Sequence, residues 1–392
     1  MIASIDHAFF FHDNVLQNLD LSNNSIVTLE GFKDLTWRYL KRLNLSYNRI
    51  ERVTNQLVKL YILEWVDLSG NRIKRVGGPL MLPGNLRHCA LNNNQMVDWP
   101  FDSVSDTLTE LTLRSNHLNS TKAALGVRTL DLSYNQLTSF CVGCFPALKE
   151  LDLSANFFEA VPDWSSLKSP PPLEKLRFSQ MPLLQEIKSN TFRKMVNLID
   201  IEINTCPQLN HIDGGSFTKL EGLKKLNLSY NGLTKVPKDM VHWDRIEQGV
   251  NLQGNPFNCD CSMQWFLDVV IRGMLRHREL HTLFPELRCS QPSGYKNEPM
   301  VHLTMYDNVL CRKALEISAI GMVNANQENQ EDHFVEQIIL ICLLVAIIIT
   351  TFYLIYLRTQ RGPSHEQVLN TFASNGAPMQ FLPCPSFRNS IY

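Results

Sequence analysis

Residues 223–233 read LKKLNLSYNGL, and this stretch decides the fold. Counted from its first residue, leucine stands at positions one, four, six and eleven, and asparagine stands at position nine. The same pattern opens at Leu16, Leu40, Leu63, Leu86, Leu108, Val127, Leu148, Leu173, Leu198, Leu223 and, in a degenerate form, Glu247. Successive copies are 19 to 25 residues apart. Such a recurrence predicts a chain built of stacked, equivalent units.

Each residue type in the pattern has a physical role. Positions four and six flank one outward residue of a short strand, so both side chains point to the same face. One unit alone cannot bury that apolar face, but stacked units can. We expect the asparagines to form a ladder whose side-chain amides bond backbone groups of the turns beside the core. This column holds Asn24, Asn48, Asn71, Asn94, Asn116, Asn135, Asn156, Asn231 and Asn255, with Met181 and Cys206 as the two departures.

A period of about 20 to 29 residues with this pattern is the signature of the leucine-rich repeat. The sequence is therefore identified as a member of the leucine-rich repeat proteins. The expected fold is an α/β solenoid, a leucine-rich repeat horseshoe of about ten to eleven repeats over residues 16–254. Residues 1–15 resemble the second half of an earlier repeat, and no cysteine-rich cap precedes them. We expect them to be a partial repeat at a truncated N-terminus.

Composition excludes several classes of function. The 392 residues carry a formal net charge of −1, with 37 basic and 38 acidic side chains. This balance argues against a nucleic-acid partner, which requires a basic face. The chain contains no GxSxG, HExxH, GxxxxGK or GxGxxG motif. His277 and His281 would share a helix face, but a metal site needs further ligands. We expect no catalytic residues, no metal and no cofactor, and so not an enzyme.

Cysteines and glycosylation motifs indicate an oxidising compartment. Four of the ten cysteines lie in the short segment 255–311, and such clustering is typical of disulfides. Cys141 and Cys144 form a CxxC motif, for which a local disulfide or two free thiols are the alternatives. Motifs for N-linked glycosylation stand at Asn23, Asn44, Asn119 and Asn227. Short motifs also arise by chance in an asparagine-rich repeat, so each is only a candidate.

Residues 255–311 form a distinct module that begins with NPFNCDC and continues with a tryptophan, CSQP and a final cysteine. It resembles the cysteine-rich C-terminal cap of extracellular leucine-rich repeat proteins with one transmembrane helix. The resemblance implies disulfides joining Cys259 to Cys289 and Cys261 to Cys311. A cap is needed because the last repeat would otherwise expose its core. Residues 263–276 predict an amphipathic helix lying on the solenoid end.

Residues 338–357 read IILICLLVAIIITTFYLIYL and carry no charge over twenty positions. A helix of that length is about 30 Å long, the thickness of a bilayer's hydrocarbon core. Arg358 and Arg361 follow it, so the positive-inside rule puts the C-terminus in the cytoplasm and the repeats outside. We therefore expect a single-pass type I protein of the plasma membrane. Residues 312–337 are polar and predict a juxtamembrane linker.

The candidate binding site is the concave strand face, which the variable positions of the pattern form. Tyr47, Trp65, His88 and Arg114 belong to consecutive repeats and are expected to lie side by side. A tryptophan flanked by tyrosine and arginine has the composition of a binding hot spot. The alternative is that these aromatic side chains only pack on their neighbours. We predict a ligand-binding patch of these four residues.

The family that the sequence resembles contains adhesion molecules, ligand receptors and co-receptors, which mostly recognise proteins. Our first hypothesis is a cell-surface receptor or adhesion protein that binds a protein ligand through its solenoid. An alternative is an innate-immune receptor related to the Toll family, without its own signalling domain because the cytoplasmic tail, 358–392, is too short. A membrane scaffold is a third hypothesis. The tail ends in SIY at 390–392, which resembles a ligand for a PDZ protein. Residues 1–15 lack the basic region and the long apolar run of a signal peptide, which departs from the family pattern and agrees with the expected truncation.

Overall fold

The computed structural model describes residues 2–3, 15–34, 37–74, 81–101, 104–243, 245, 249–275, 287–312, 343–345 and 347–351. The chain divides into two compact units, Met1–Glu316 and Ile317–Tyr392. Among the described residues, no helix has the length and apolar character that a membrane crossing requires. The predicted span at 338–357 lies largely outside the described residues, and the predicted PDZ ligand at 390–392 lies wholly outside them.

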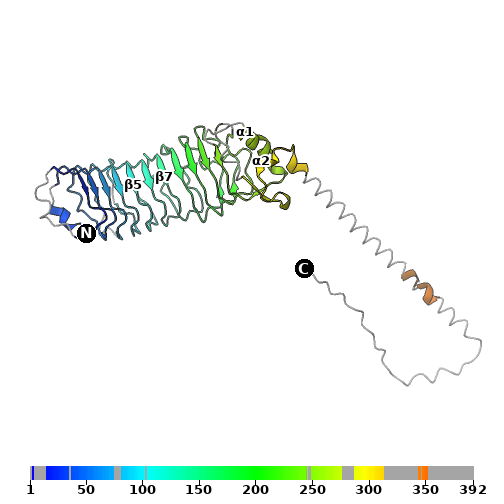
Figure 1. Cartoon of the computed structure of the whole chain (residues 1–392), viewed down its shortest axis with the longest axis horizontal. Helices are drawn as coiled ribbons and strands as arrows, with labels where there is room; N and C mark the ends of the chain where they lie inside the picture. The colour runs from blue at the N-terminus through cyan, green and yellow to red at the C-terminus, as the bar shows by residue number, and fades with distance from the viewer. Residues whose placement is uncertain are drawn as a thin grey trace, which may run out of the picture. The chain divides into compact units, whose positions relative to one another are not determined.

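The first unit is built on one parallel sheet of eleven strands, which follow one another in chain order (Figure 1). The strands are β1 (Asn18–Asp20), β2 (Arg42–Asn44), β3 (Trp65–Asp67), β4 (His88–Ala90), β5 (Glu110–Thr112), β6 (Thr129–Asp131), β7 (Glu150–Asp152), β8 (Lys175–Arg177), β10 (Asp200–Glu202), β12 (Lys225–Asn227) and β13 (Val250–Asn251). Each falls on the third to fifth positions of one copy of the pattern. The predicted leucine-rich repeat solenoid is therefore confirmed, down to its degenerate last copy.

The class of the solenoid needs a correction, because it is a β-solenoid rather than an α/β one. In the described residues between β1 and β13, the outer connections contain turns, the 3-10 helix η2 (Glu30–Asp34) and the short strands β9 (Glu186–Ile187) and β11 (His211–Ile212). A repeat of 19 to 25 residues uses eleven for the strand pattern. The 8 to 14 that remain must turn twice to return to the sheet, which leaves no room for several helical turns.

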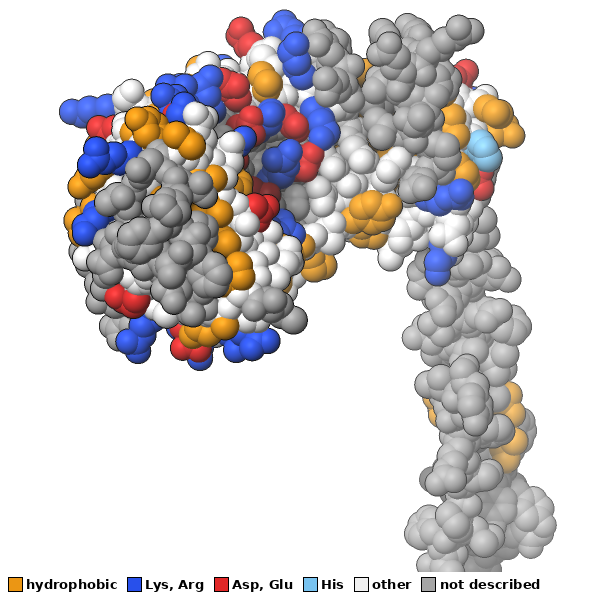
Figure 2. Space-filling view, turned by 60° about the vertical axis from the view of Figure 1, so that its left-hand side comes forward, with side chains coloured by type: hydrophobic (Ala, Val, Ile, Leu, Met, Phe, Trp, Pro, Cys, Tyr) orange, Lys and Arg blue, Asp and Glu red, His pale blue; other side chains and the backbone are white. Residues whose placement is uncertain are grey.

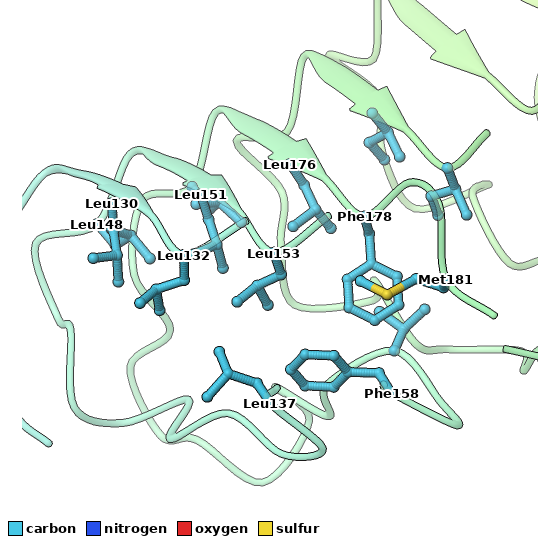
Figure 3. Close-up of a cluster of buried hydrophobic side chains, with 14 of the residues drawn as sticks. Leu130, Leu132, Leu137, Leu148, Leu151, Leu153, Phe158, Leu176, Phe178 and Met181 are labelled. Carbon is cyan, nitrogen blue, oxygen red and sulfur yellow. The ribbon is translucent and has the colours of Figure 1, made fainter. Parts of the chain in front are cut away.

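The core is a continuous column of side chains from positions one, four, six and eleven. Leu130, Leu132, Leu151 and Leu153 lie on and just after β6 and β7 and all point inward, and Phe158 enters the same core from the opposite side (Figure 3). These five residues are at most 2% exposed. Burying one such side chain contributes about 1.5–3 kcal/mol. The core is therefore shared between neighbouring repeats, and no repeat closes its own core.

The asparagine column joins each repeat to the one before it. Asn135 Nδ2 donates to the carbonyl oxygens of Leu113 and Leu132, at 3.0 Å each. Its Oδ1 accepts the backbone N–H of Leu118 at 3.0 Å. Leu113 and Leu118 belong to the preceding repeat, so one buried amide satisfies backbone groups of two repeats. The same bonds recur at Asn48, Asn71, Asn94, Asn116, Asn156 and Asn255.

Two repeats depart from the regular turn. In the eighth and ninth repeats, Met181 and Cys206 replace the asparagine, and the backbone N–H of Met181 donates to Cys206 Sγ at 3.4 Å. These repeats also carry one extra residue before the next buried leucine. In the eighth, Leu183 is 37% exposed and Leu184 is buried. After this turn, β9 and β11 pair in parallel to form a second, two-stranded sheet.

The C-terminal module covers the end of the solenoid with short elements. These are β14 (Phe257–Asn258), η3 (Cys261–Met263), η4 (Phe266–Ile271), α1 (Arg272–Met274), β15 (Cys289–Gln291), η6 (Ser293–Tyr295) and α2 (Met300–Leu303). Disulfides join Cys259 to Cys289 and Cys261 to Cys311, the pairing that the family resemblance implies. A further disulfide closes the Cys141–Cys144 turn.

The predicted amphipathic helix at 263–276 is confirmed over its described part, because residues 264–274 are helical without a break. The helix changes type along its length: the 3-10 helix η3 leads into it, its middle is the π-helix η4 and its end is α1, and residues 276–286 lie outside the described residues. Phe266 and Val270 are buried as expected, whereas Val269 is 53% exposed. The ring centroids of Phe266 and Trp243 are 5.7 Å apart, and this contact joins the module to the solenoid.

The two kinds of disulfide predict different losses of stability. Cys261 and Cys311 are 50 residues apart, so opening this loop should cost about 4 kcal/mol of chain entropy. Cys141 and Cys144 are 3 apart, and their loop should contribute only about 2 kcal/mol. Thermal unfolding of Cys261→Ser/Cys311→Ser should therefore begin at a clearly lower temperature than that of Cys141→Ser/Cys144→Ser. Equal melting temperatures for the two double variants would contradict this ranking.

Candidate protein-binding face

The solvent side of the eleven-stranded sheet, called the strand face below, carries the side chains at positions three and five. Strands in a parallel sheet lie about 4.8 Å apart. The pairing is in register, with Trp65 opposite both Arg42 and His88, and His88 opposite Glu110. Residues at the same position of the pattern therefore form straight rows across the repeats.

One row combines a cation, two aromatic rings and a carboxylate. The Arg42 guanidinium lies over the Trp65 ring, 5.4 Å from its centroid. The Trp65 and His88 rings are stacked, with centroids 5.3 Å apart and planes 9° from parallel. His88 Nδ1 is 3.0 Å from Glu110 Oε2. We call these four side chains, from β2 to β5, the aromatic row.

Trp65 is half-buried rather than fully exposed, because its neighbours cover parts of its ring. This arrangement agrees with both interpretations of Trp65, as a binding hot spot and as a residue that packs on its neighbours. It packs on adjacent side chains, and it also leaves part of its surface open on the strand face. Cation–π contacts of the Arg42 type contribute about 0.5–1 kcal/mol at exposed sites, which favours the orientation of the ring seen here.

Tyr47 and Arg114 stand outside this row, at other positions of the pattern, and the ligand-binding patch of Tyr47, Trp65, His88 and Arg114 stays a prediction. Tyr47 stands at position eight, three residues after β2, where its φ is +54°. Its ring lies against Gly70 of the next repeat, so close that a β-carbon there would be 2.7 Å from Tyr47 Cδ1. Arg114 stands at position seven, and its guanidinium lies 4.3 Å from the centroid of the Tyr134 ring.

Two members of the aromatic row, Arg42 and Glu110, were not among the predicted site residues. Both occupy position three of the pattern, as Trp65 and His88 do. This shared position could have identified them from the sequence as neighbours of Trp65 and His88. The in-register pairing of β2 to β5 then brings the four together.

Further along the strand face, opposite charges alternate from repeat to repeat. Lys175 Nζ is 2.8 Å from Glu150 Oε1, Arg177 Nε is 3.5 Å from Glu202 Oε2, and Lys225 also pairs with Glu202. Basic and acidic side chains are likewise interleaved on the visible surface in Figure 2 rather than separated into large patches. We call this set the ion-pair lattice. Its charges largely neutralise one another.

Asp152, which lies beside the ion-pair lattice, has a raised pKa. Burial raises the pKa of Asp152, and the neighbouring carboxylate of Asp131 raises it further. Hydrogen bonds from Ser154 and the charge of Arg177 act in the opposite direction. Asp131 and Asp152, at position five of adjacent repeats, thus lie close together in a partly desolvated environment. Such an environment disfavours ionisation of both carboxylates.

The four glycosylation motifs have two kinds of surroundings. Asn23 and Asn119 are exposed and lie outside the strands. Asn44 and Asn227 lie on β2 and β12, and each Oδ1 accepts the backbone N–H of the motif's own serine, at 3.0 and 3.1 Å. Both serines are buried.

In the described part of the chain, no group of three or more His, Cys, Asp or Glu side chains could hold a metal ion. His277 and His281 lie outside the described residues.

Comparison with known proteins agrees with this architecture. A family model described as leucine rich repeat matches residues 14–73. Mouse (Mus musculus) podocan is 31% identical over 205 residues, which is 48% of this chain and 33% of podocan; the chain thus spans only a third of that relative. The crystal structure of the APL1 leucine-rich repeat domain has a TM-score of 0.52 at 20% identity and covers 69% of this chain and 74% of that one. This likeness concerns the fold alone.

Pig (Sus scrofa) fibromodulin is 33% identical over 144 residues, and this match covers 35% of the chain and 95% of the fibromodulin sequence. The repeats, the asparagine column and the parallel sheet of this chain are the features expected of a leucine-rich repeat protein. This chain belongs to the leucine-rich repeat family.

Proposed function

We propose that this protein is a cell-surface receptor or adhesion protein that binds a protein ligand through its strand face. The observation that carries the proposal is the aromatic row, in which Trp65 stacks on His88 beneath Arg42. Tryptophan and arginine are enriched among the residues that dominate protein–protein binding energy. Here they are held in one orientation before any ligand arrives, which lowers the entropy cost of binding.

The aromatic row is a better contact than the ion-pair lattice on the same face. A ligand that used Lys175, Arg177 or Glu202 would first have to break the ion pairs that these side chains already form. Exchanging one ion pair for another gives little net affinity. A ligand on the row instead covers the open part of the Trp65 ring, and removal of that apolar surface from water is favourable.

We further propose that residues 338–357 anchor the protein in the plasma membrane with the repeats outside the cell. Twenty uncharged residues match the thickness of a bilayer's hydrocarbon core, and Arg358 and Arg361 follow on the cytoplasmic side. Three disulfides in the repeat-containing unit support an oxidising compartment for it. Of the glycosylation motifs, Asn23 and Asn119 are the better candidates, because both are exposed and lie outside the strands.

Truncation of the central tryptophan should separate binding from stability. Trp65→Ala should weaken binding about thirtyfold, since hot-spot aromatics contribute about 2 kcal/mol or more. Its melting temperature should change little, because the core positions are intact. A screen of extracellular proteins against the wild type and Trp65→Ala in parallel makes the comparison before the ligand is known. Tyr230→Ala, which removes a 55% exposed aromatic ring at position eight of the tenth repeat, away from the aromatic row, is the matched control.

The proposal requires ligands that the wild type and Tyr230→Ala retain and Trp65→Ala loses. If all three proteins retain the same ligands with the same affinities, the aromatic row is not the binding site. If Trp65→Ala melts at a much lower temperature, the tryptophan is mainly structural.

The membrane anchor is tested by deleting residues 338–357 from the chain expressed in cultured cells behind an added secretion signal. The undeleted chain should remain in the membrane pellet after alkaline carbonate extraction, because a spanning helix resists it. The deletion variant should appear in the medium. Release of the undeleted chain into the carbonate supernatant would contradict the anchor.

A further inference from the structure

A hollow opens on the flank of the solenoid where the seventh repeat meets the eighth. Its volume is about 540 Å³, and its lining includes Phe140, Phe157, Phe158, Leu183, Glu159 and Asp163. The hollow lies beside the turn that follows the asparagine column, at the point where this turn becomes one residue longer in the eighth repeat. Up to the seventh repeat, the residue two places after the asparagine column is buried, as Phe158 is, but in the eighth repeat Leu183 at that place stays outside.

The walls of the hollow are apolar and partly open to solvent. Phe157 is 45% exposed and Leu183 is 37% exposed, whereas Phe158 beneath them is 2% exposed. Phe140 forms another wall, and its ring stacks on buried Phe145 with centroids 5.3 Å apart and planes 10° from parallel. A contiguous apolar surface of this kind on a folded protein marks an interaction site more often than a single exposed side chain does.

This wall is also fixed in place. Phe140 and Phe145 flank the turn that the Cys141–Cys144 disulfide closes. Phe158 packs edge to face on Phe178 of the eighth repeat, with centroids 5.2 Å apart. The hollow is therefore formed without a ligand, and a ligand would not need to order it.

Two carboxylates lie on the rim. Within the described part of the chain, neither Glu159 nor Asp163 has an ion-pair partner within 4.0 Å. Asp163 Oδ1 accepts the backbone N–H of Ser165 at 2.7 Å. Hydrogen bonds from Ser165 lower the pKa of Asp163, and the nearby Lys194 lowers it slightly more, so this carboxylate is charged at neutral pH. Lys194 itself is engaged, since its Nζ donates to the Leu167 carbonyl at 2.7 Å.

We propose that this hollow, the flank pocket, binds a short basic segment of a partner protein. An aliphatic or aromatic side chain of the segment enters between Phe157 and Leu183, and an adjacent lysine or arginine pairs with Glu159 and Asp163. Charge complementarity selects this occupant, because the rim carries two acids beside an apolar floor. The flank pocket is a second site, separate from the strand face, and it does not depend on the aromatic row.

Fluorescein-labelled hexapeptides and the purified full chain test the proposal by fluorescence anisotropy. The probe KRFLRK has both required features, KRGSRK lacks the apolar side chains and EDFLDE reverses the charge. We expect KRFLRK to bind and the other two peptides to bind at least tenfold more weakly. Raising the salt concentration should weaken KRFLRK binding, since an exposed ion pair is screened.

Variants locate the binding. Glu159→Lys and Leu183→Ser should each weaken KRFLRK binding at least fivefold. Glu221→Lys makes the same charge change at an exposed residue just before the tenth repeat. Its affinity for KRFLRK should stay within twofold of the wild-type affinity. The same result is expected for Trp65→Ala. Thermal melts check folding, and Glu159→Lys remains decisive if Leu183→Ser melts early, because Glu159 is exposed.

Three results would overturn the flank pocket. One is the absence of KRFLRK binding to the wild type. Another is equal affinity for KRFLRK and KRGSRK, which would make the interaction electrostatic only. The third is an equal loss of binding in Glu159→Lys and Glu221→Lys, which would place the peptide elsewhere on the surface.

Discussion

The structure depends on a buried side-chain amide that bonds two repeats at once. Asn116, for example, donates to the carbonyl oxygens of Leu91 and Leu113, and its Oδ1 accepts the backbone N–H of Met96. Leu91 and Met96 belong to the preceding repeat. A buried backbone group without a partner costs about 1–3 kcal/mol, so these bonds fix how each repeat stacks on the last. Apolar packing supplies the driving force, but it is less directional and does not set this register alone.

Registered stacking in turn creates the surface that we propose binds the ligand. Because the strands pair without slippage, side chains at one position of the pattern become neighbours across repeats. The outward residue at position three varies from repeat to repeat, because positions one, four, six and eleven fill the core. The same face can therefore carry the aromatic row at one end and the ion-pair lattice at the other. The flank pocket lies beside the eighth repeat, the first of the two repeats with the longer turn.

The periodic features could be predicted from the sequence because each obeys one repeating constraint. The eleven strands and the asparagine column follow from the spacing of leucine and asparagine. What could not be predicted lies where the local backbone departs from the repeat. The sequence Leu183-Leu184 does not reveal which leucine is buried, and the π-helix η4 resembles an ordinary amphipathic helix in its pattern.

The most direct test of this account is urea unfolding of three variants at one repeat. Asn135→Ala should lower the free energy of unfolding by about 3 kcal/mol, because three buried backbone groups lose their partner at about 1 kcal/mol or more each. Asn135→Cys should lower it less, since Cys206 already holds this column and receives a backbone N–H. Gln136→Ala, at the adjacent exposed residue, is the control. An Asn135→Ala protein as stable as the control would contradict the central role of the asparagine ladder.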